Sequence, residues 1–369
     1  MCRSAENPKA AAAARDPANR AGRARRVLGP ALAGLMVLGL GRAADAAGTA
    51  QTWAGLHPGT GTAASCAPEP APAGTYGLVP FVTGFDSRTY SYGNINFACS
   101  GASAPAFAAD GSSYFVSSPD GYVYRFGPNG GAVGAPLSTL GPTLSSPVLG
   151  LDGRLYATRA ATTGDFRTGA ILEIDPVSGA QRRIVAANLT CPLNMAVDPL
   201  SGDLFATGGC FGAGGDDPSL WRVHDPAGAA TVSVYATLPG TPNGELAFAP
   251  DGTLYVDVGY TGAGQIYVVS GTDRPMPPTV AALAGIVSRF AVRIGETNAD
   301  GSARSLLVRR TGDLLEAVEI ADPAAGTALG HNVWPHAAGP DGYRYVGGGT
   351  AEYRLVPDTI FADGFDRPG

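Results

Sequence analysis

The chain has 369 residues, of which 45% are hydrophobic and only 15% are charged, and it contains 53 glycines and 30 prolines. The apolar fraction is too high for an intrinsically disordered protein, and turn formers at this frequency disfavour a helical bundle and favour many short strands. Lys9 is the only lysine, which excludes Schiff-base chemistry and P-loop nucleotide binding from the rest of the chain.

The N-terminal region has the pattern of an export signal. Four arginines between positions 20 and 26 precede an apolar run at 27–40 and a small-residue stretch at 43–47. This order predicts a secretory signal peptide over 1–46, and the apolar run, interrupted by glycine and proline, is too short for a membrane anchor. We therefore expect an exported protein with no membrane span once the signal is removed.

Loss of the predicted signal makes the chain more acidic. Residues 1–46 hold eight of the 25 basic and three of the 31 acidic residues, so 17 basic and 28 acidic residues remain and the net charge changes from −6 to −11. Such a surface repels phosphate groups, so neither a nucleic acid nor an anionic lipid surface is expected as a partner.

The cysteines fit an exported protein. Four remain after residue 46, and an even number in an oxidising compartment indicates two disulfides, for which three pairings exist. We favour Cys66–Cys99 and Cys191–Cys210, because these pairs close short local loops. The alternative, a cysteine metal site, lacks the usual C-x-x-C spacing.

The next two segments precede any repeat. Residues 47–77, rich in Gly, Pro and Ala, are expected to form an irregular lead-in. The apolar segment Leu78–Thr83 then predicts a single β-strand without a hairpin partner nearby, so its partner must come from elsewhere in the chain.

From Ala104 onward one pattern recurs six times. Each copy has a short apolar strand, a turn that ends in glycine (usually Asp-Gly) and a second apolar strand. The turn glycines are Gly111, Gly153, Gly202, Gly252, Gly301 and Gly342, at spacings of 42, 49, 50, 49 and 41 residues. Asp-Gly is favoured in hairpin turns whose two central residues both have positive φ. A third and often a fourth strand follow, and four short strands in 40 to 50 residues are typical of a β-propeller blade.

The sequence therefore predicts an all-β chain with a single β-propeller over 78–357. We expect six blades of four antiparallel strands, seven being the alternative, with Leu78–Thr83 pairing into the last blade to close the ring. Residues 358–369 form a C-terminal tail. This tail resembles a short C-terminal signature of exported proteins in some Gram-negative bacteria, which implies a location in the periplasm, on the cell surface or outside the cell.

One blade carries a resemblance to a known family. The segment Thr241–Tyr255, TPNGELAFAPDGTLY, resembles the SMP-30/gluconolactonase and strictosidine-synthase-like propellers, and the similarity to NHL and streptogramin-lyase repeats is comparable. The resemblance implies a divalent metal such as Ca²⁺ on the central axis, with Asn243 and Asn194 as candidate ligands. In such a site the metal polarises a lactone carbonyl and activates water.

Three positions differ from the family pattern. One extra residue before Pro250 places Gly244 where the ligand asparagine is expected, and Ser145–Pro147 stands where a glutamate is expected. Arg289 lies in the segment expected to supply an aspartate, and its guanidinium would repel a cation. We therefore predict a monomeric, non-catalytic binding or scaffold module. The alternative is a divalent-metal-dependent lactonase, another hydrolase or a lyase.

The expected ligand of this module is a small molecule, a glycan or a protein at the loop face of the propeller. Besides Asn194 and Asn243, Asp257 and Tyr260 are candidate binding residues, because they begin the long loop of the fourth repeat.

The remaining candidate residues have simpler interpretations. His331 and His336 flank a short loop, a spacing that suits either two histidines near a metal or, more commonly, an exposed pair, and His224 ends a strand. Asp216 and Asp217 lie in a Gly-rich loop and suit either Ca²⁺ binding or ordinary solvated turns.

Overall fold

The computed structural model describes residues 56–58, 69–70, 76–85, 88–92, 95–100, 103–117, 121–141, 147–159, 169–190, 192–208, 217–240, 242, 244–258, 264–270, 277–310, 313–348 and 350–357. The predicted signal peptide and tail lie outside this set, and each predicted disulfide involves at least one cysteine outside it. Every regular element in the described residues is a strand, so none of them forms a helix able to cross a membrane.

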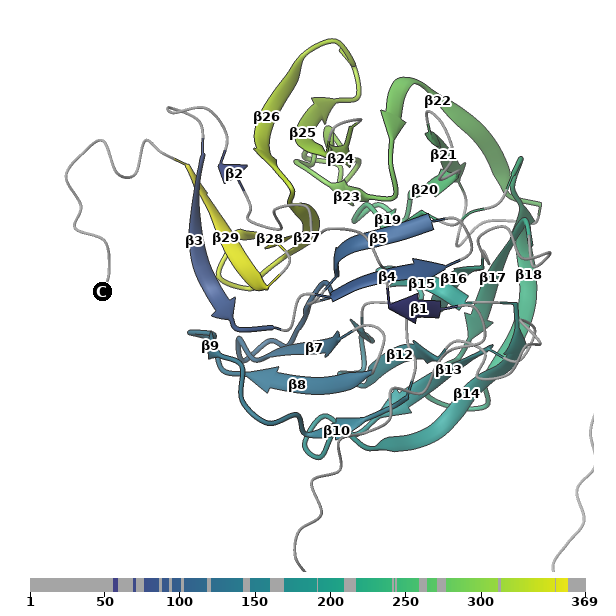
Figure 1. Cartoon of the computed structure of the whole chain (residues 1–369). Coiled ribbons are helices and arrows are strands. Elements are labelled where there is room, and N and C mark those ends of the chain that lie inside the picture. Colours follow the sequence, from purple (N-terminus) through teal and green to yellow (C-terminus); the bar gives the residue numbers. More distant parts are fainter. Residues whose placement is uncertain are drawn as a thin grey trace, which may run out of the picture. The chain divides into compact units, whose positions relative to one another are not determined.

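Six sheets of four antiparallel strands form a six-bladed β-propeller, as predicted (Figure 1). From the inside outward, blades 1 to 3 are β6 (Ala106–Phe107), β7 (Ser113–Ser117), β8 (Tyr122–Phe126), β10 (Ser138–Thr139); β11 (Val148–Leu149), β12 (Leu155–Arg159), β13 (Gly169–Ile174), β14 (Gln181–Leu189); and β15 (Pro192–Val197), β16 (Leu204–Gly208), β17 (Ser219–His224), β18 (Thr231–Thr237). Blades 4 to 6 are β19 (Leu246–Phe248), β20 (Leu254–Val258), β21 (Gly264–Ser270), β22 (Thr279–Ser288); β23 (Val292–Ile294), β24 (Ser305–Arg309), β25 (Leu314–Glu319), β26 (Gly326–His331); and β27 (Trp334–Ala338), β28 (Arg344–Gly348), β29 (Ala351–Pro357), β3 (Tyr76–Thr83).

The repeated Asp-Gly motif forms the turn between the first two strands of a blade. All six turn glycines have φ between +76° and +85°, a region that other residues rarely adopt. The preceding aspartate is not in this region, so the prediction of two positive φ angles was wrong. Instead the aspartate caps the turn, as in blade 4, where Oδ1 of Asp251 accepts a hydrogen bond of 2.9 Å from the backbone N–H of Thr253.

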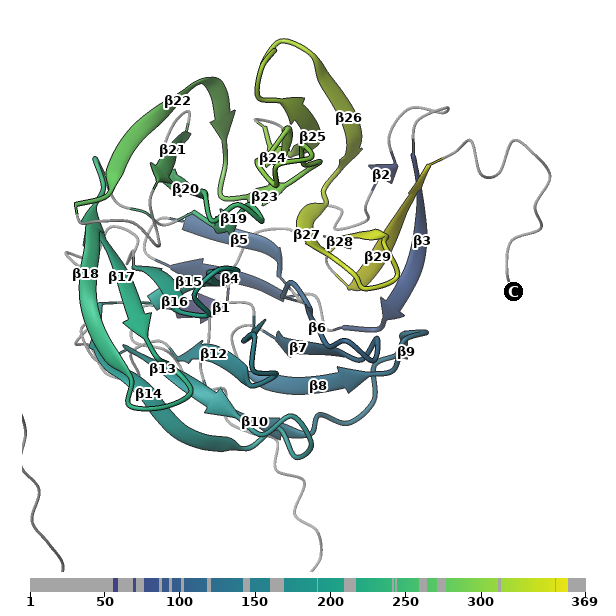
Figure 2. The same ribbon diagram turned by 180° about the vertical axis from the view of Figure 1, so that it is seen from behind.

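The first propeller strand closes the ring. β3 pairs antiparallel with β29, with Leu78 opposite Leu355, so blade 6 combines the start and the end of the propeller sequence (Figure 2). This confirms the predicted closure. Phe81 packs edge-on against Tyr345 with ring centroids 4.9 Å apart, and Phe85 contacts Phe115 of blade 1. Closure therefore buries an aromatic cluster between blades 6 and 1.

Among the described residues, apolar side chains form a layer between each pair of neighbouring blades. Strands in the middle of a blade are covered on both faces, which explains why β13 and β20 are buried along their whole length instead of alternating. The outer strands have a free edge and exposed positions, as in β18, where Val234 is 53% exposed.

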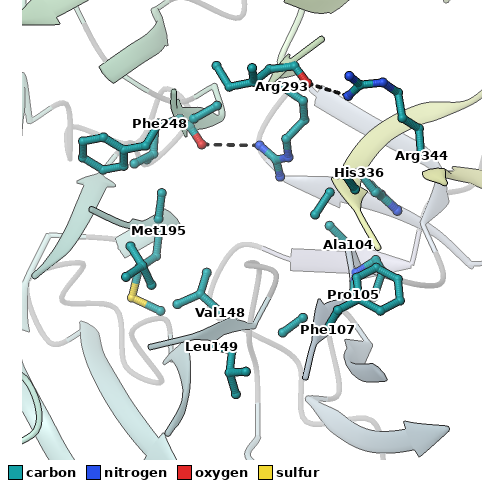
Figure 3. Close-up of a pocket in the computed structure, with 18 of the residues that line it drawn as sticks. Ala104, Pro105, Phe107, Val148, Leu149, Met195, Phe248, Arg293, His336 and Arg344 are labelled. Carbon is teal, nitrogen blue, oxygen red and sulfur yellow. Dashed lines mark hydrogen bonds between the residues drawn. The ribbon is translucent and has the colours of Figure 1, made fainter. Parts of the chain in front are cut away.

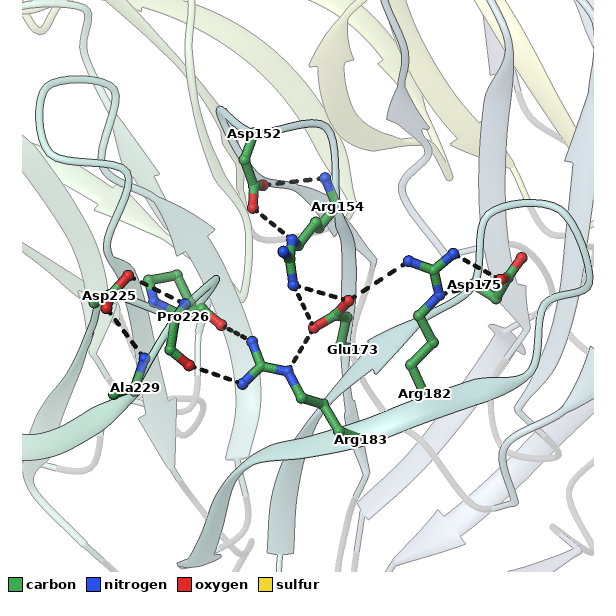
Figure 4. Close-up of polar contacts among 10 residues, drawn as sticks. Asp152, Arg154, Glu173, Asp175, Arg182, Arg183, Asp225, Pro226 and Ala229 are labelled. Atoms are coloured by element: carbon green, nitrogen blue, oxygen red, sulfur yellow. Dashed lines mark hydrogen bonds and ion pairs between the residues drawn. The ribbon is translucent and has the colours of Figure 1, made fainter. Parts of the chain in front are cut away.

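A charged network joins blades 2 and 3 (Figure 4). Glu173 on β13 is only 3% exposed. Its carboxylate forms ion pairs with Arg154 and Arg183, with nitrogen–oxygen distances of 3.1 and 2.6 Å. Arg183 also donates to the carbonyl oxygens of Pro226 and Gly228 in blade 3. Burial alone would raise the pKa of Glu173, but the arginines outweigh it and lower the pKa.

Several short strands were not predicted. β1 (Leu56–Pro58) pairs with β4 (Arg88–Tyr92), and β4 pairs with β5 (Ile95–Ser100), which gives a separate three-stranded sheet. β2 (Glu69–Pro70) adds to the outer edge of blade 5, and β9 (Gly131–Ala132) runs parallel to β3. Two of these strands, β1 and β2, lie in the segment that was expected to be an irregular lead-in.

Candidate functional site

The innermost strands of all six blades surround one cavity of about 510 Å³ (Figure 3). Blades 1 to 4 contribute apolar side chains to its wall, among them those of Phe107, Leu149, Met195 and Phe248. The polar residues lie mainly on blades 5 and 6, as Figure 3 shows for Arg293, Arg344 and His336. The cavity thus has an apolar side and a cationic side.

Arg293 projects from β23 and is neutralised within the wall. Its guanidinium lies 3.0 Å from both carboxylate oxygens of Glu245, the residue just before β19. It also donates to the carbonyl oxygen of Val292 at 3.0 Å. Burial raises the pKa of Glu245, and the nearby Arg293 opposes that rise. Arg293 therefore links blade 5 to blade 4, and Glu245 is its counter-ion.

Arg344, the first residue of β28, differs from Arg293 in having no carboxylate partner among the described residues. Its Nη1 donates to the carbonyl oxygen of Ile294 at 2.8 Å, but no carboxylate oxygen in the described part of the chain lies within ion-pair distance of its guanidinium. Burial lowers the pKa of Arg344. An arginine nevertheless stays protonated at neutral pH, so the cavity wall carries a positive charge without a described counter-ion.

His336 on β27 is the third polar residue of the wall. It is 4% exposed, and its Nδ1 lies 2.8 Å from both carboxylate oxygens of Glu352 on β29, which is fully buried. The ring covers Gly347, where a Cβ would lie 2.3 Å from the imidazole. The prediction that His336 is an exposed loop residue is therefore wrong: it sits in an inner strand and is held by a buried carboxylate.

Asn194, the first candidate ligand, is in β15, and its side-chain amide donates to the carbonyl oxygen of Gly244 at 2.9 Å. The structure thus brings Asn194 next to the Asn243 segment, although Asn243 itself lies outside the described residues, as does Tyr260.

Asp257 lies inside β20 instead of at the start of a loop, and it is fully buried. Neither of its carboxylate oxygens has a hydrogen-bond partner of normal geometry. Burial, and to a smaller extent the neighbouring Glu245, raise the pKa of Asp257 well above its usual value, against the opposing influence of Ser288 and the backbone of Phe290. Ser288 ends β22 of blade 4, and Phe290 lies between β22 and β23 of blade 5.

The divalent metal implied by the family resemblance does not fit the residues that the structure describes. The amide nitrogen of Asn194 donates to the carbonyl oxygen of Gly244, and the carboxylate of Glu245 is already paired with Arg293. No group of three or more His, Cys, Asp or Glu side chains suited to a metal occurs within the described ranges.

The remaining candidates lie away from the cavity. His224, at the end of β17, has its Nδ1 3.1 Å from both oxygens of Asp203, and the histidine side chain is 66% exposed. His331 ends β26 and is half-buried. Asp217 accepts a hydrogen bond of 2.9 Å from the backbone N–H of Ser219, which is an ordinary turn contact, and Asp216 is outside the described residues.

The chain is similar to known proteins in structure, whereas no match is found to a family model or a curated sequence. Among solved structures, a gluconolactonase from Xanthomonas campestris is similar with a TM-score of 0.55 and 17% identity, over 82% of this chain and 98% of that one. An auxiliary nutrient binding protein from Bacteroides ovatus has a TM-score of 0.56 and 12% identity, over 77% of each chain.

The chain has the fold of the SMP-30/gluconolactonase-like six-bladed propellers. A luciferin-regenerating enzyme shares it as well, with a TM-score of 0.51, 14% identity and coverage of 76% of this chain and 95% of that one. The resemblance seen in the sequence is thus confirmed at the level of fold. At these identities, what a fold neighbour binds or converts is not transferable to this chain.

Sequence reasoning did not assign Arg293, Arg344 or His336 to the site. Comparing equivalent positions of the six repeats in the sequence would have identified the two arginines. At the position of Arg293 the other blades carry alanine or valine: Ala106, Val148, Ala196, Ala247 and Ala337. Arg344 stands where blades 2 to 4 have Leu155, Leu204 and Leu254. Polar departures from the repeat in the first two strands of a blade therefore mark the cavity wall.

Proposed function

We propose that this protein is a non-catalytic binding module that takes up a small molecule with an apolar body in the central cavity. The observation that carries the proposal is the cavity of about 510 Å³, to which all six inner strands contribute and whose wall is mostly apolar. Small-molecule sites typically have volumes of roughly 300–1,000 Å³ and apolar walls with a few placed polar groups.

The local chemistry supports binding over catalysis. Arg293 and His336 are each engaged with a buried carboxylate, so they stiffen the wall. A wall held by such contacts is suited to a preformed binding site. The nutrient-binding protein of Bacteroides ovatus provides a fold precedent for binding, and the gluconolactonase provides one for catalysis. The misfit of the described residues to a metal site favours the former.

We further propose that the module works outside the cytoplasm. The export pattern over 1–46, the four cysteines beyond it and the C-terminal tail all support the periplasm or the exterior of a Gram-negative cell. We expect the protein to be a monomer with the disulfides Cys66–Cys99 and Cys191–Cys210. Non-reducing mass spectrometry of the exported chain tests both the cleavage site and these bonds.

A neutral fluorescent probe tests the cavity. N-phenyl-1-naphthylamine gains fluorescence when it leaves water for an apolar site, and we expect saturable binding of about one probe per chain. Ala337 lines the cavity and its side chain is exposed, so Ala337→Trp should fill the space without repacking the core. This variant should weaken probe binding by about tenfold or more.

The matched control is Ala281→Trp, the same change at an exposed alanine on the outer strand β22, which should leave binding unchanged. Equal binding by both variants would overturn the proposed site. Turnover of a lactone by the Ca²⁺-loaded protein would overturn the non-catalytic assignment instead.

A further inference from the structure

The polar groups around the cavity differ in their partners. Arg293 is paired with Glu245 at 3.0 Å, and His336 with Glu352 at 2.8 Å. Arg344 has only a neutral partner, the carbonyl oxygen of Ile294 at 2.8 Å. Among the described residues that line the cavity, Arg344 is thus the cation whose charge is left to a ligand.

The environment of this guanidinium favours a ligand anion. Burial lowers the pKa of Arg344, which is the sign of a charge that has lost part of its hydration. A carboxylate brought into contact would supply charge-assisted hydrogen bonds, and the planar guanidinium can form two of them in parallel. The phenol of Tyr76 also lies near the guanidinium, and the other Nη and Nε donors make no hydrogen bond to a described residue, so they remain available to a carboxylate.

The rest of the wall limits what else the ligand carries. Phe107, Met195 and Phe248 face the same cavity and suit an apolar body. One uncompensated cation matches one anionic group, whereas a polyanion would bring charges that the wall cannot balance. The chain beyond residue 46 has a net charge of −11, which adds a long-range penalty for polyanions.

We infer that the ligand of the central cavity is an apolar monocarboxylic acid whose carboxylate is bound by Arg344. This inference rests on the proposed binding function and specifies its ligand class. The acid is held at one side by the arginine of β28, while its hydrocarbon or aromatic part lies against the inner strands of blades 1 to 4.

Displacement of N-phenyl-1-naphthylamine at neutral pH tests the inference, with decanoate and 1-decanol as competitors that differ only in the charged group. In the unmodified protein, decanoate should displace the probe at a concentration about tenfold lower than decanol. In Arg344→Met, whose side chain keeps much of the volume, decanoate and decanol should become equivalent. Arg344→Lys should retain part of the preference.

The control is Arg304→Met, which removes an arginine that is half-exposed on blade 5 and paired with Glu296 and Glu319. It should preserve the preference for the acid. Unaltered probe binding by Arg344→Met shows that this variant is folded. Equal displacement by acid and alcohol in the unmodified protein, or a preference that survives Arg344→Met, would overturn the inference and leave the proposed binding function intact. Failure of the probe to bind at all would overturn both.

Discussion

Nδ1 of His336 lies 2.8 Å from both carboxylate oxygens of Glu352, and both residues are almost completely buried in blade 6. The contact crosses from the innermost strand β27 to the third strand β29, over the bare backbone of Gly347. Burial raises the pKa of Glu352, and His336 only partly opposes this. The His336 side of the cavity wall is therefore held by a carboxyl group whose ionised form is disfavoured by burial.

Glu352→Gln should change how stability depends on pH. A raised pKa in the folded state means that the carboxyl stabilises the fold at low pH and loses this contribution as pH rises from its unfolded pKa of about 4.3. Glutamine cannot ionise, yet its oxygen can still accept a hydrogen bond from His336. The free energy of unfolding of the variant, relative to the unmodified protein, should therefore increase between pH 4.5 and 7.5, as measured by urea denaturation.

The control for this experiment is Glu319→Gln, at a carboxylate whose side chain is 40% exposed. Its effect should be small at both pH values. A relative stability of Glu352→Gln that falls with rising pH would show that the ionised Glu352, paired with His336, stabilises the fold.

Asp257→Asn should change the pH dependence of the free energy of unfolding in the same direction as Glu352→Gln, and by more. Asp257 is fully buried, its oxygens have no partner of normal geometry, and burial raises its pKa well above the usual value. The unmodified protein should lose stability as pH rises from about 4, since folding then opposes ionisation. Removing the ionisable group should flatten that part of the pH profile. Asp110→Asn is the contrast, because hydrogen bonds from Ser112 lower the pKa of that exposed carboxyl; a similar flattening there would refute the assignment to Asp257.

The fold was predictable because its determinants are local and repeated six times. Each turn needs a glycine at positive φ, and in five of the six turns an aspartate precedes it and caps the turn, so the pair recurs at blade spacing, as at Asp251–Gly252. The isolated strand around Leu78 lacked a local partner, and ring closure is the way a propeller supplies one. Strands such as β4 and β5 lie outside the repeat, so no internal comparison could reveal them.

The site was less predictable because it depends on which neighbours meet at the axis. Arg344 follows a turn by sequence, and only the packing of blade 6 against blade 5 brings it to Ile294 and the cavity. Asp257 looks like the start of a loop, but β20 extends to Val258 and buries it. The family resemblance identified the fold, while the residues that distinguish this chain are those that depart from its own repeat.

Gly342→Ala should isolate the energetic cost of the repeated turn. Gly342 has φ of +81°, and a Cβ added there would meet no atom within 4 Å, so only backbone strain opposes alanine. We expect a loss of about 1–2 kcal/mol in the free energy of unfolding. Gly127 also has open space for a Cβ but no positive φ, so Gly127→Ala should be neutral or slightly stabilising. Equal losses would contradict a role for φ.

Arg183→Met should weaken the connection between blades 2 and 3. Nε of Arg183 lies 2.6 Å from a Glu173 oxygen, and its other nitrogens bond the carbonyl oxygens of Pro226 and Gly228 (Figure 4). Arg154 still compensates Glu173 in the variant, so we expect a loss of about 1–2 kcal/mol instead of the larger cost of a fully unpaired buried charge.

Arg182→Met is the matched comparison, since Arg182 is half-exposed, bonds Asp175 within its own blade at 2.7 Å and lies 3.8 Å from Glu173. Exposed pairs of this kind contribute little, so its unfolding curve should overlay that of the unmodified protein. The pKa of Glu173 is lowered in the fold, so the ion pairs stabilise the protein above the unfolded pKa of about 4.3 and lose this contribution as pH falls. The deficit of Arg183→Met should therefore shrink in acid. A deficit that is constant with pH would assign the effect to the carbonyl contacts with blade 3 alone.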